Sequence, residues 1–175
     1  MKKIIGTVIT LAIGGTVYTF SQADVVKNFS KETGLTQQEA EEYVSGIEEE
    51  DLMSFDEIGS DYISLGQDLV SGTTEIDCVN YEYEWGSSTL TCNEGKSQLK
   101  RFGNSAIALG RAYKAIDTEE AGEDEISSAI RYIDRMNSDL LLDIVTQMLD
   151  PPTIDEITKT NSYNKALLQA ALESE

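Results

Sequence analysis

Two cysteines, Cys78 and Cys92, are the first residues in this sequence whose type and spacing point to a chemistry. A zinc site needs about four ligands at short paired spacings, and the chain has no histidine and no second cysteine pair. A redox-active pair favours the Cys-x-x-Cys arrangement, whereas thirteen residues separate these two cysteines. The spacing therefore favours a structural disulfide bond over metal binding or redox chemistry.

Several common enzyme mechanisms require groups that this chain lacks. The absence of histidine excludes the Ser-His-Asp and Cys-His mechanisms. The sequence has no G-x-S-x-G motif, no P-loop and no dinucleotide-binding motif. Pairs of carboxylates carry no information in a chain with 32 acidic residues, although a hydrolase that uses two of them is one hypothesis. We assign no catalytic residue, no metal ligand and no cofactor.

The chain is strongly acidic, with 13 basic and 32 acidic residues and a formal net charge of −19. Such a surface repels nucleic acid and anionic lipid head groups, so we expect neither as a partner. Solubility in a salty medium is the simplest explanation of this charge. Binding of a divalent cation or of a cationic partner is the alternative.

One segment, from 95 to 116, has the opposite charge, because it holds five basic residues and no acidic one. The simplest interpretation is that this helix packs among acidic helices and gains diffuse electrostatic support. The alternative is that its basic side chains contact an anion or an acidic partner. The candidate residues for that contact are Lys96, Lys100, Arg101, Arg111 and Lys114.

The N-terminus has the pattern of a bacterial secretory signal peptide. Lys2 and Lys3 precede an uncharged stretch over 4–20, and Ser21-Gln22-Ala23 places small residues at the −3 and −1 positions. We predict a signal peptide over 1–23 that is cleaved after Ala23. In the alternative, residues 4–20 stay on the protein as a membrane anchor, although a spanning helix usually needs about 20 apolar residues. Export predicts a periplasmic or secreted protein, in which a disulfide bond persists.

The apolar residues over 24–175 recur mostly at helical spacing, which predicts a single, mainly α domain. Ser or Thr stands three residues before Glu at three helix starts, a pattern typical of a capping box. We expect helices that begin near Asp24, Thr36, Ser54, Ser97, Asp124 and Thr153. The helix from Asp124 is expected to run for about 25 residues, with a break near Asn137 as an alternative.

Residues 76–93 depart from the helical pattern and predict a β-hairpin inserted between two helices. Tyr81 and Tyr83 alternate with polar residues, and glycine and serine follow at the expected turn. In the register that this turn sets, Cys78 faces Cys92 at a close-approach pair of the ladder. The predicted fold class is therefore a small helical domain with one disulfide-clipped β-hairpin.

The tip of that hairpin would present Trp85, the only tryptophan of the chain. Aromatic residues supply much of the binding energy at protein interfaces. Trp85, Tyr81 and Tyr83 are therefore candidate contacts for a protein partner. In the alternative, the tryptophan folds back onto the helices of its own chain, since large aromatic side chains are commonly buried.

Four glycines on the two helices that flank this segment share a spacing of seven residues. Gly59 and Gly66 lie on nearly one face of the first helix, and Gly103 and Gly110 do so on the second. If the two helices are antiparallel, Gly59 lies near Gly110 and Gly66 near Gly103, so that the backbones approach closely. Loose or broken helices are the alternative, since glycine costs a helix about 1 kcal/mol relative to alanine.

Three functions remain open on the sequence. The first is an exported, non-enzymatic interaction or structural module of the bacterial envelope, whose partner is another envelope or secreted protein. The second is a soluble periplasmic binder of a cation or small ligand. The third is the carboxylate-based hydrolase. A membrane is expected to contact the chain only through residues 4–20, if these are retained.

Overall fold

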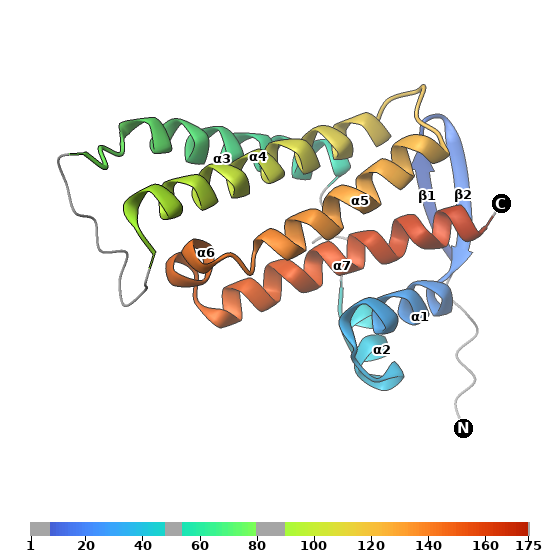
Figure 1. The fold of residues 1–175 in the computed structure, drawn as a ribbon. Coiled ribbons are helices and arrows are strands. Elements are labelled where there is room, and N and C mark those ends of the chain that lie inside the picture. Colours follow the sequence, from blue (N-terminus) through green and yellow to red (C-terminus); the bar gives the residue numbers. More distant parts are fainter. Residues whose placement is uncertain (1–7, 48–53, 80–89, 175) are drawn as a thin grey trace.

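The computed structural model describes residues 8–47, 54–79 and 90–174. Within these residues, a two-stranded hairpin precedes seven helices (Figure 1). The described elements are β1 (Val8–Ile13), β2 (Thr16–Ser21), α1 (Gln22–Thr33), α2 (Gln37–Ser45), α3 (Phe55–Glu75), α4 (Cys92–Ile116), α5 (Glu123–Asp139), α6 (Asp143–Met148) and α7 (Pro151–Glu173). None of the described helices has the length and apolar character needed to cross a membrane. The structure confirms the predicted fold class, mainly α with one β-hairpin.

The hairpin is formed by β1 and β2, at a place that the sequence prediction did not expect. Gly14 and Gly15 both have positive φ, 56° and 73°, as a tight two-residue hairpin turn requires. The strands are antiparallel, and the inward side chains Ile13, Tyr18 and Phe20 are buried. β2 contacts α7 and α1, so the hairpin supplies part of the hydrophobic core (Figure 1).

These strands occupy the segment in which we predict the signal peptide. The predicted cleavage point after Ala23 falls inside α1, which begins at Gln22 with Ser21 as its N-cap. The Ser21 hydroxyl accepts a hydrogen bond from the backbone N–H of Asp24 at 3.2 Å, and the Asp24 carboxylate accepts one from the backbone of Ser21. The signal peptide stays a prediction, and its removal would take buried core residues with it.

The predicted hairpin at 76–93 requires a correction at both ends. Cys92 is the first residue of α4 and Cys78 lies in a turn, so the two cysteines do not face each other across a ladder. The physical reason is a capping box that the prediction missed: Thr91 accepts from the backbone N–H of Glu94, and the Glu94 carboxylate accepts from the backbone N–H of Thr91. The helix therefore begins five residues before the expected Ser97.

The centre of that segment, residues 80–89, lies outside the described residues. It contains all three candidate partner contacts, Tyr81, Tyr83 and Trp85. Their role as contacts for a protein partner stays a prediction.

The glycine pairing between α3 and α4 is confirmed. A Cβ atom built on Gly59 would lie 2.7 Å from the carbonyl oxygen of Gly110, and one on Gly110 would lie 2.5 Å from that of Gly59. The second pair, Gly66 and Gly103, shows the same close approach. Any side chain at these positions would collide with the opposite backbone, so glycine allows the two helices to pack backbone against backbone.

The C-terminal half differs from the prediction in two helix boundaries. The long helix expected from Asp124 is divided into α5 and α6 by a turn at 140–142, close to the alternative break near Asn137. α7 begins at Pro151, because Asp150 is the N-cap and accepts from the backbone N–H of Thr153 at 2.8 Å. Thr153 is therefore inside the helix, and the expected capping box with Glu156 is wrong.

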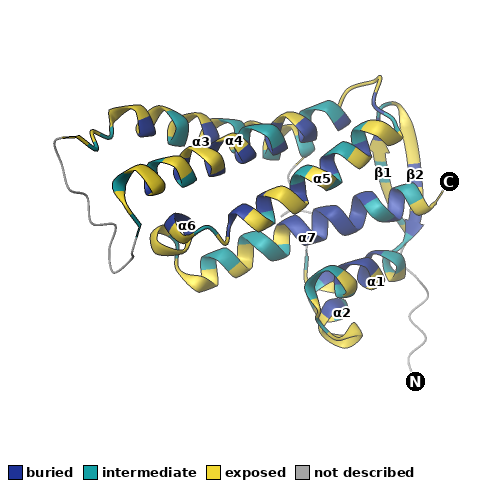
Figure 2. Ribbon diagram, viewed as in Figure 1, coloured by how far each residue is buried: buried dark blue, intermediate teal, exposed yellow. Residues whose placement is uncertain are grey.

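The core is centred on α7, whose C-terminal half is buried around its whole circumference from Asn161 to Leu168 (Figure 2). This includes the cation of Lys165, which lies 2.6 Å from Glu32 of α1 and 2.6 Å from Asp134 of α5. Burial alone would raise the pKa of Glu32, but the hydrogen bonds from Lys165 and Gln169 outweigh it and hold that pKa below its usual value. The ion pairs thus join α1, α5 and α7.

Candidate functional site

A large cavity opens between five helices, α2, α3, α4, α6 and α7, with one further residue from α5. Its volume is about 1050 Å³. Most of the lining is apolar or aromatic. The lining residues of α3 are Ile58, Asp61, Tyr62, Leu65 and Leu69, and those of the other helices include Tyr43, Leu99, Phe102, Met136, Val145, Met148, Ile157, Asn161 and Tyr163.

The wall on α3 follows directly from the order of its residues. Ile58, Tyr62, Leu65 and Leu69 are spaced by four, three and four residues, so they form one stripe along the helix. The glycine face of α3 lies beside this stripe and is occupied by α4. Since α3 has no other extensive helix partner among the described residues, its second apolar stripe faces the cavity, and Leu65 remains 44% exposed.

The opposite wall is part of the protein core. Leu99 and Phe102 of α4, Met136 of α5 and Val145 of α6 are buried. Met148, at the end of α6, is 54% exposed and lies at the mouth. The cavity therefore passes from a buried apolar interior to an opening that contains exposed apolar side chains.

Three polar side chains of the lining, Tyr62, Asn161 and Asn164, belong to two hydrogen-bonded groups. The Tyr62 hydroxyl donates to the side-chain oxygen of Asn161 at 2.6 Å, and the Asn161 amide donates to the side-chain oxygen of Asn137 at 2.9 Å. The Asn164 amide donates to the Tyr113 hydroxyl at 3.4 Å. These groups satisfy one another across α3, α4, α5 and α7, so burying them carries little cost.

The two tyrosines of these groups are neutral at physiological pH. Burial raises the pKa of Tyr62 to about 12, although its hydrogen bond to Asn161 opposes the shift. Burial also raises the pKa of Tyr113, and the nearby Tyr62 adds to this. The cavity interior is therefore polar only through uncharged groups.

The charged residues of the lining are all acidic. Glu42 of α2, Asp61 of α3 and Glu156 of α7 are exposed, and among the residues that the structure describes no lysine or arginine lines the cavity. No group of three or more metal-ligating side chains is arranged for an ion in the described part of the chain. The cavity can therefore bind an apolar molecule, because its interior presents no charged side chain among the described residues.

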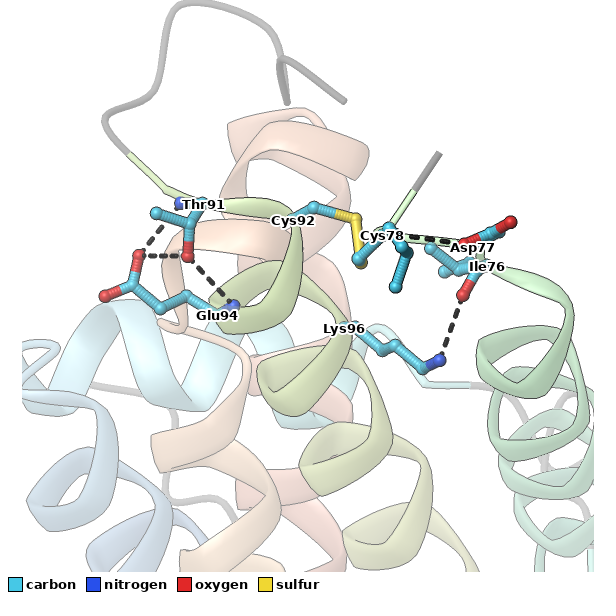
Figure 3. The surroundings of a disulfide bond; sticks show 8 residues. Ile76, Asp77, Cys78, Thr91, Cys92, Glu94 and Lys96 are labelled. Carbon is cyan, nitrogen blue, oxygen red and sulfur yellow. Dashed lines mark hydrogen bonds between the residues drawn. A yellow bond between two sulfur atoms is a disulfide. The ribbon is translucent and has the colours of Figure 1, made fainter. Parts of the chain in front are cut away.

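The predicted disulfide bond between Cys78 and Cys92 is confirmed. Figure 3 shows that it joins the segment after α3 to the first residue of α4, with Cα atoms 5.6 Å apart. Beside it, the Lys96 ammonium donates to the backbone carbonyl of Ile76 at 2.9 Å. Neither cysteine lines the cavity, so the bond acts on the site only by tying its two helices together.

The five candidate anion contacts on α4 are not gathered into one site. Arg101 forms an ion pair with the buried Asp139 at 2.6 Å, and Lys114 forms one with Asp56 at 2.6 Å. Lys96 donates a hydrogen bond to the backbone carbonyl of Ile76 beside the disulfide, and Lys100 is exposed. Arg111 lines a second, smaller hollow of about 390 Å³ together with Arg131, Asp124 and Glu125. An anion site on this helix stays a prediction.

No protein-family model, curated protein or solved structure matches the chain. The cavity is therefore the feature that bears on function, and no pattern in the sequence predicts it. The apolar stripe on α3 can be read from the spacing of its residues, but an apolar stripe predicts burial without distinguishing a neighbouring helix from a cavity.

Proposed function

We propose that this protein binds a small, largely apolar molecule in the cavity between α2, α3, α4, α6 and α7. The observation that supports the proposal is the cavity itself: its volume of about 1050 Å³ is at the upper end of the range of small-molecule sites, roughly 300–1000 Å³. Apolar walls with a few placed polar groups are typical of such sites. This is the second of the functions considered from the sequence, a binder of a small ligand.

We further propose that the protein works outside the cytoplasm, in the periplasm or as a secreted protein. The Cys78–Cys92 disulfide supports this location, because disulfide bonds persist in oxidising compartments and are rare in the cytosol. A carrier or reservoir of an apolar molecule is useful in such an aqueous compartment, where the free molecule dissolves poorly.

Binding of a neutral apolar dye, Nile red, tests this function. We expect the dye to gain fluorescence with the protein and to be displaced by long-chain alcohols. The variant Leu65→Trp narrows the mouth of the cavity and should weaken dye binding by about tenfold, which corresponds to about 1.4 kcal/mol. Gln67→Trp is the matched control, since Gln67 is exposed on the same helix and does not line the cavity.

Two outcomes would count against the proposed function. One is a dye signal that the two tryptophan variants reduce equally, because this would place the dye elsewhere on the surface. The other is the absence of saturable binding by a protein whose circular dichroism shows it to be folded.

A further inference from the structure

We infer that the molecule held in this cavity is an amphipathic cation, with an apolar body inside and an amine or quaternary ammonium head group at the mouth. The inference rests on the proposed binding function and names the class of its ligand. Two features of the cavity support it: the charged residues of its lining are acidic, and several polar side chains of its lining already have hydrogen-bond partners within the protein.

The charged side chains at the mouth of the cavity are negative. Glu42, Asp61 and Glu156 come from three different helices, and all are exposed. Each therefore lies where the lining meets solvent. None of them takes part in an ion pair within the described residues. Lys159, three residues after Glu156 on α7, is paired with Asp155 at 2.7 Å.

These carboxylates form no ion pair, and they decide which head group fits; Glu42 accepts one hydrogen bond, from the side-chain amide of Gln38 at 3.2 Å. A cationic head group at the mouth would be attracted by up to three carboxylates, whereas a carboxylate, sulfate or phosphate would meet the same groups with no lysine or arginine in the lining to offset the repulsion. Fatty acids and anionic lipids are therefore poor ligands for this cavity.

The polar groups of Tyr62, Asn161 and Asn164 in the lining already have hydrogen-bond partners within the protein. The Tyr62 hydroxyl and the Asn161 amide donate to side chains of the protein itself, so an apolar body can enter without leaving these donors unpaired. A charged group buried there would lose its hydration without gaining a counter-ion. The charged end of the ligand must therefore stay at the mouth.

Aromatic side chains add a third, independent reason. Tyr43 and Tyr62 are half-buried lining residues and follow Glu42 and Asp61 directly in the sequence, whereas Phe102 and Tyr163 of the lining are buried. The face of an aromatic ring attracts a cation through its quadrupole, and quaternary ammonium groups are bound in this way by several aromatic rings together. The lining thus combines aromatic rings with acidic residues, and both favour a positive head group.

The test uses three probes that share a dodecyl chain and differ in the head group: dodecyltrimethylammonium, dodecyldimethylamine oxide and dodecyl sulfate. Each is used below its micelle concentration at neutral pH, and its affinity is measured by displacement of Nile red. We expect the ammonium to bind about tenfold tighter than the uncharged amine oxide, and the sulfate to bind most weakly. In about 1 M salt, where the Debye length is about 3 Å, the difference should shrink to less than about threefold.

The net charge of the whole protein would also attract a cation, so the experiment needs a charge-matched control. The cavity variant carries Glu42→Gln, Asp61→Asn and Glu156→Gln. The control variant carries Asp117→Asn, Glu119→Gln and Glu120→Gln, three exposed positions that do not line the cavity. Both variants lose three negative charges and keep the shapes of the side chains.

The inference is supported if the cavity variant loses the preference for the ammonium and the control variant keeps it. Equal behaviour of the two variants would overturn it, because the attraction would then come from the net charge. Nile red binding with no preference among the probes would also overturn it while leaving the proposed binding function standing. A failure of Nile red to bind the folded wild-type protein would instead remove the proposed function itself.

Discussion

Four glycines set the distance between α3 and α4. Gly59 faces Gly110 and Gly66 faces Gly103, with the carbonyl oxygen of each residue against the Cα of its partner. Each glycine costs its helix about 1 kcal/mol relative to alanine, and the close approach offsets this cost. At this distance the side chain of Ile63 packs directly against the backbone of α4, as its contact with a Cβ built on Gly110 shows.

Substitution at one of these glycines should destabilise the protein. A Cβ added at position 110 would lie 2.5 Å from the carbonyl oxygen of Gly59 and 2.9 Å from the backbone nitrogen of Ile63, neither of which can move alone. We expect Gly110→Ala to lower the free energy of unfolding by about 2 kcal/mol, measured by urea denaturation. Gly72→Ala on α3 is the control, since a Cβ there meets no atom within 4 Å. That variant should be neutral or stabilised by up to about 1 kcal/mol, and an equal response of the two variants would contradict the packing argument.

At the scale of elements, α3 is attached to the molecule mainly through α4. The two helices are tied at both ends, by the Lys114–Asp56 ion pair at one end and by the Cys78–Cys92 disulfide at the other. The ion pair is partly exposed, and such pairs contribute about 1 kcal/mol or less. The disulfide is therefore the stronger of the two connections, and it keeps the cavity wall on α3 in place.

Removal of the disulfide should loosen α3 more than the rest of the fold. In the chain-entropy model, closing a loop of this size contributes about 3 kcal/mol, so the double variant Cys78→Ser, Cys92→Ser should lose about that much stability in urea denaturation. Hydrogen exchange should accelerate in α3, most strongly toward Glu75, before it does in α7. Treating the wild-type protein with a thiol reductant should reproduce the loss and leave the double variant unchanged. Uniform acceleration across α3 and α7 would show that the disulfide supports the whole fold instead.

The elements that could be predicted from the sequence are those set by a few neighbouring residues. The capping boxes at Thr36 and Ser54 open α2 and α3 as expected, because the pattern needs only four residues. The same pattern at Thr91 and Glu94 opens α4, but the residues before it alternate as in a strand, and this competing signal hides the helix start. The glycine pairs were also predictable, because the spacing of seven fixes which residues meet when two helices run antiparallel.

The cavity was beyond such an argument. Its wall on α3 is an apolar stripe that looks the same in sequence whether a helix or a void faces it. What decides between the two is the placement of α7, which reaches α3 through the hydrogen bond between Asn161 and Tyr62 and leaves the rest of the stripe open. That placement depends on contacts between residues about a hundred positions apart, 62 and 161, and no local pattern encodes it.

At the scale of the whole molecule, the N-terminal hairpin closes one end of the core around α7 (Figure 1). Its sequence carries a hairpin signal, a Gly-Gly pair between alternating residues such as Thr16, Val17, Tyr18 and Thr19. The same residues form an uncharged run after two lysines, which is why they were assigned to a signal peptide. In the structure the alternation is real: Tyr18 and Phe20 are buried, and Val17 is 63% exposed.

A chain that begins at Gln22 should therefore be much less stable than the full chain. It loses the buried side chains of Ile13, Tyr18 and Phe20, and burial of each contributes about 1.5–3 kcal/mol, so the loss should be about 5 kcal/mol or more. That is comparable to the whole stability of many domains, and urea denaturation of the truncated chain should show an early, broad transition.

Two single variants separate packing from truncation: Phe20→Ala should cost about 3 kcal/mol, whereas Val17→Thr, on the exposed face, should change little. A truncated chain as stable as the full one would contradict this role of the hairpin. Cleavage after Ala23 would produce nearly the same chain, so that result would favour the signal peptide. The measured mass of the exported protein should then correspond to a chain that begins at Asp24.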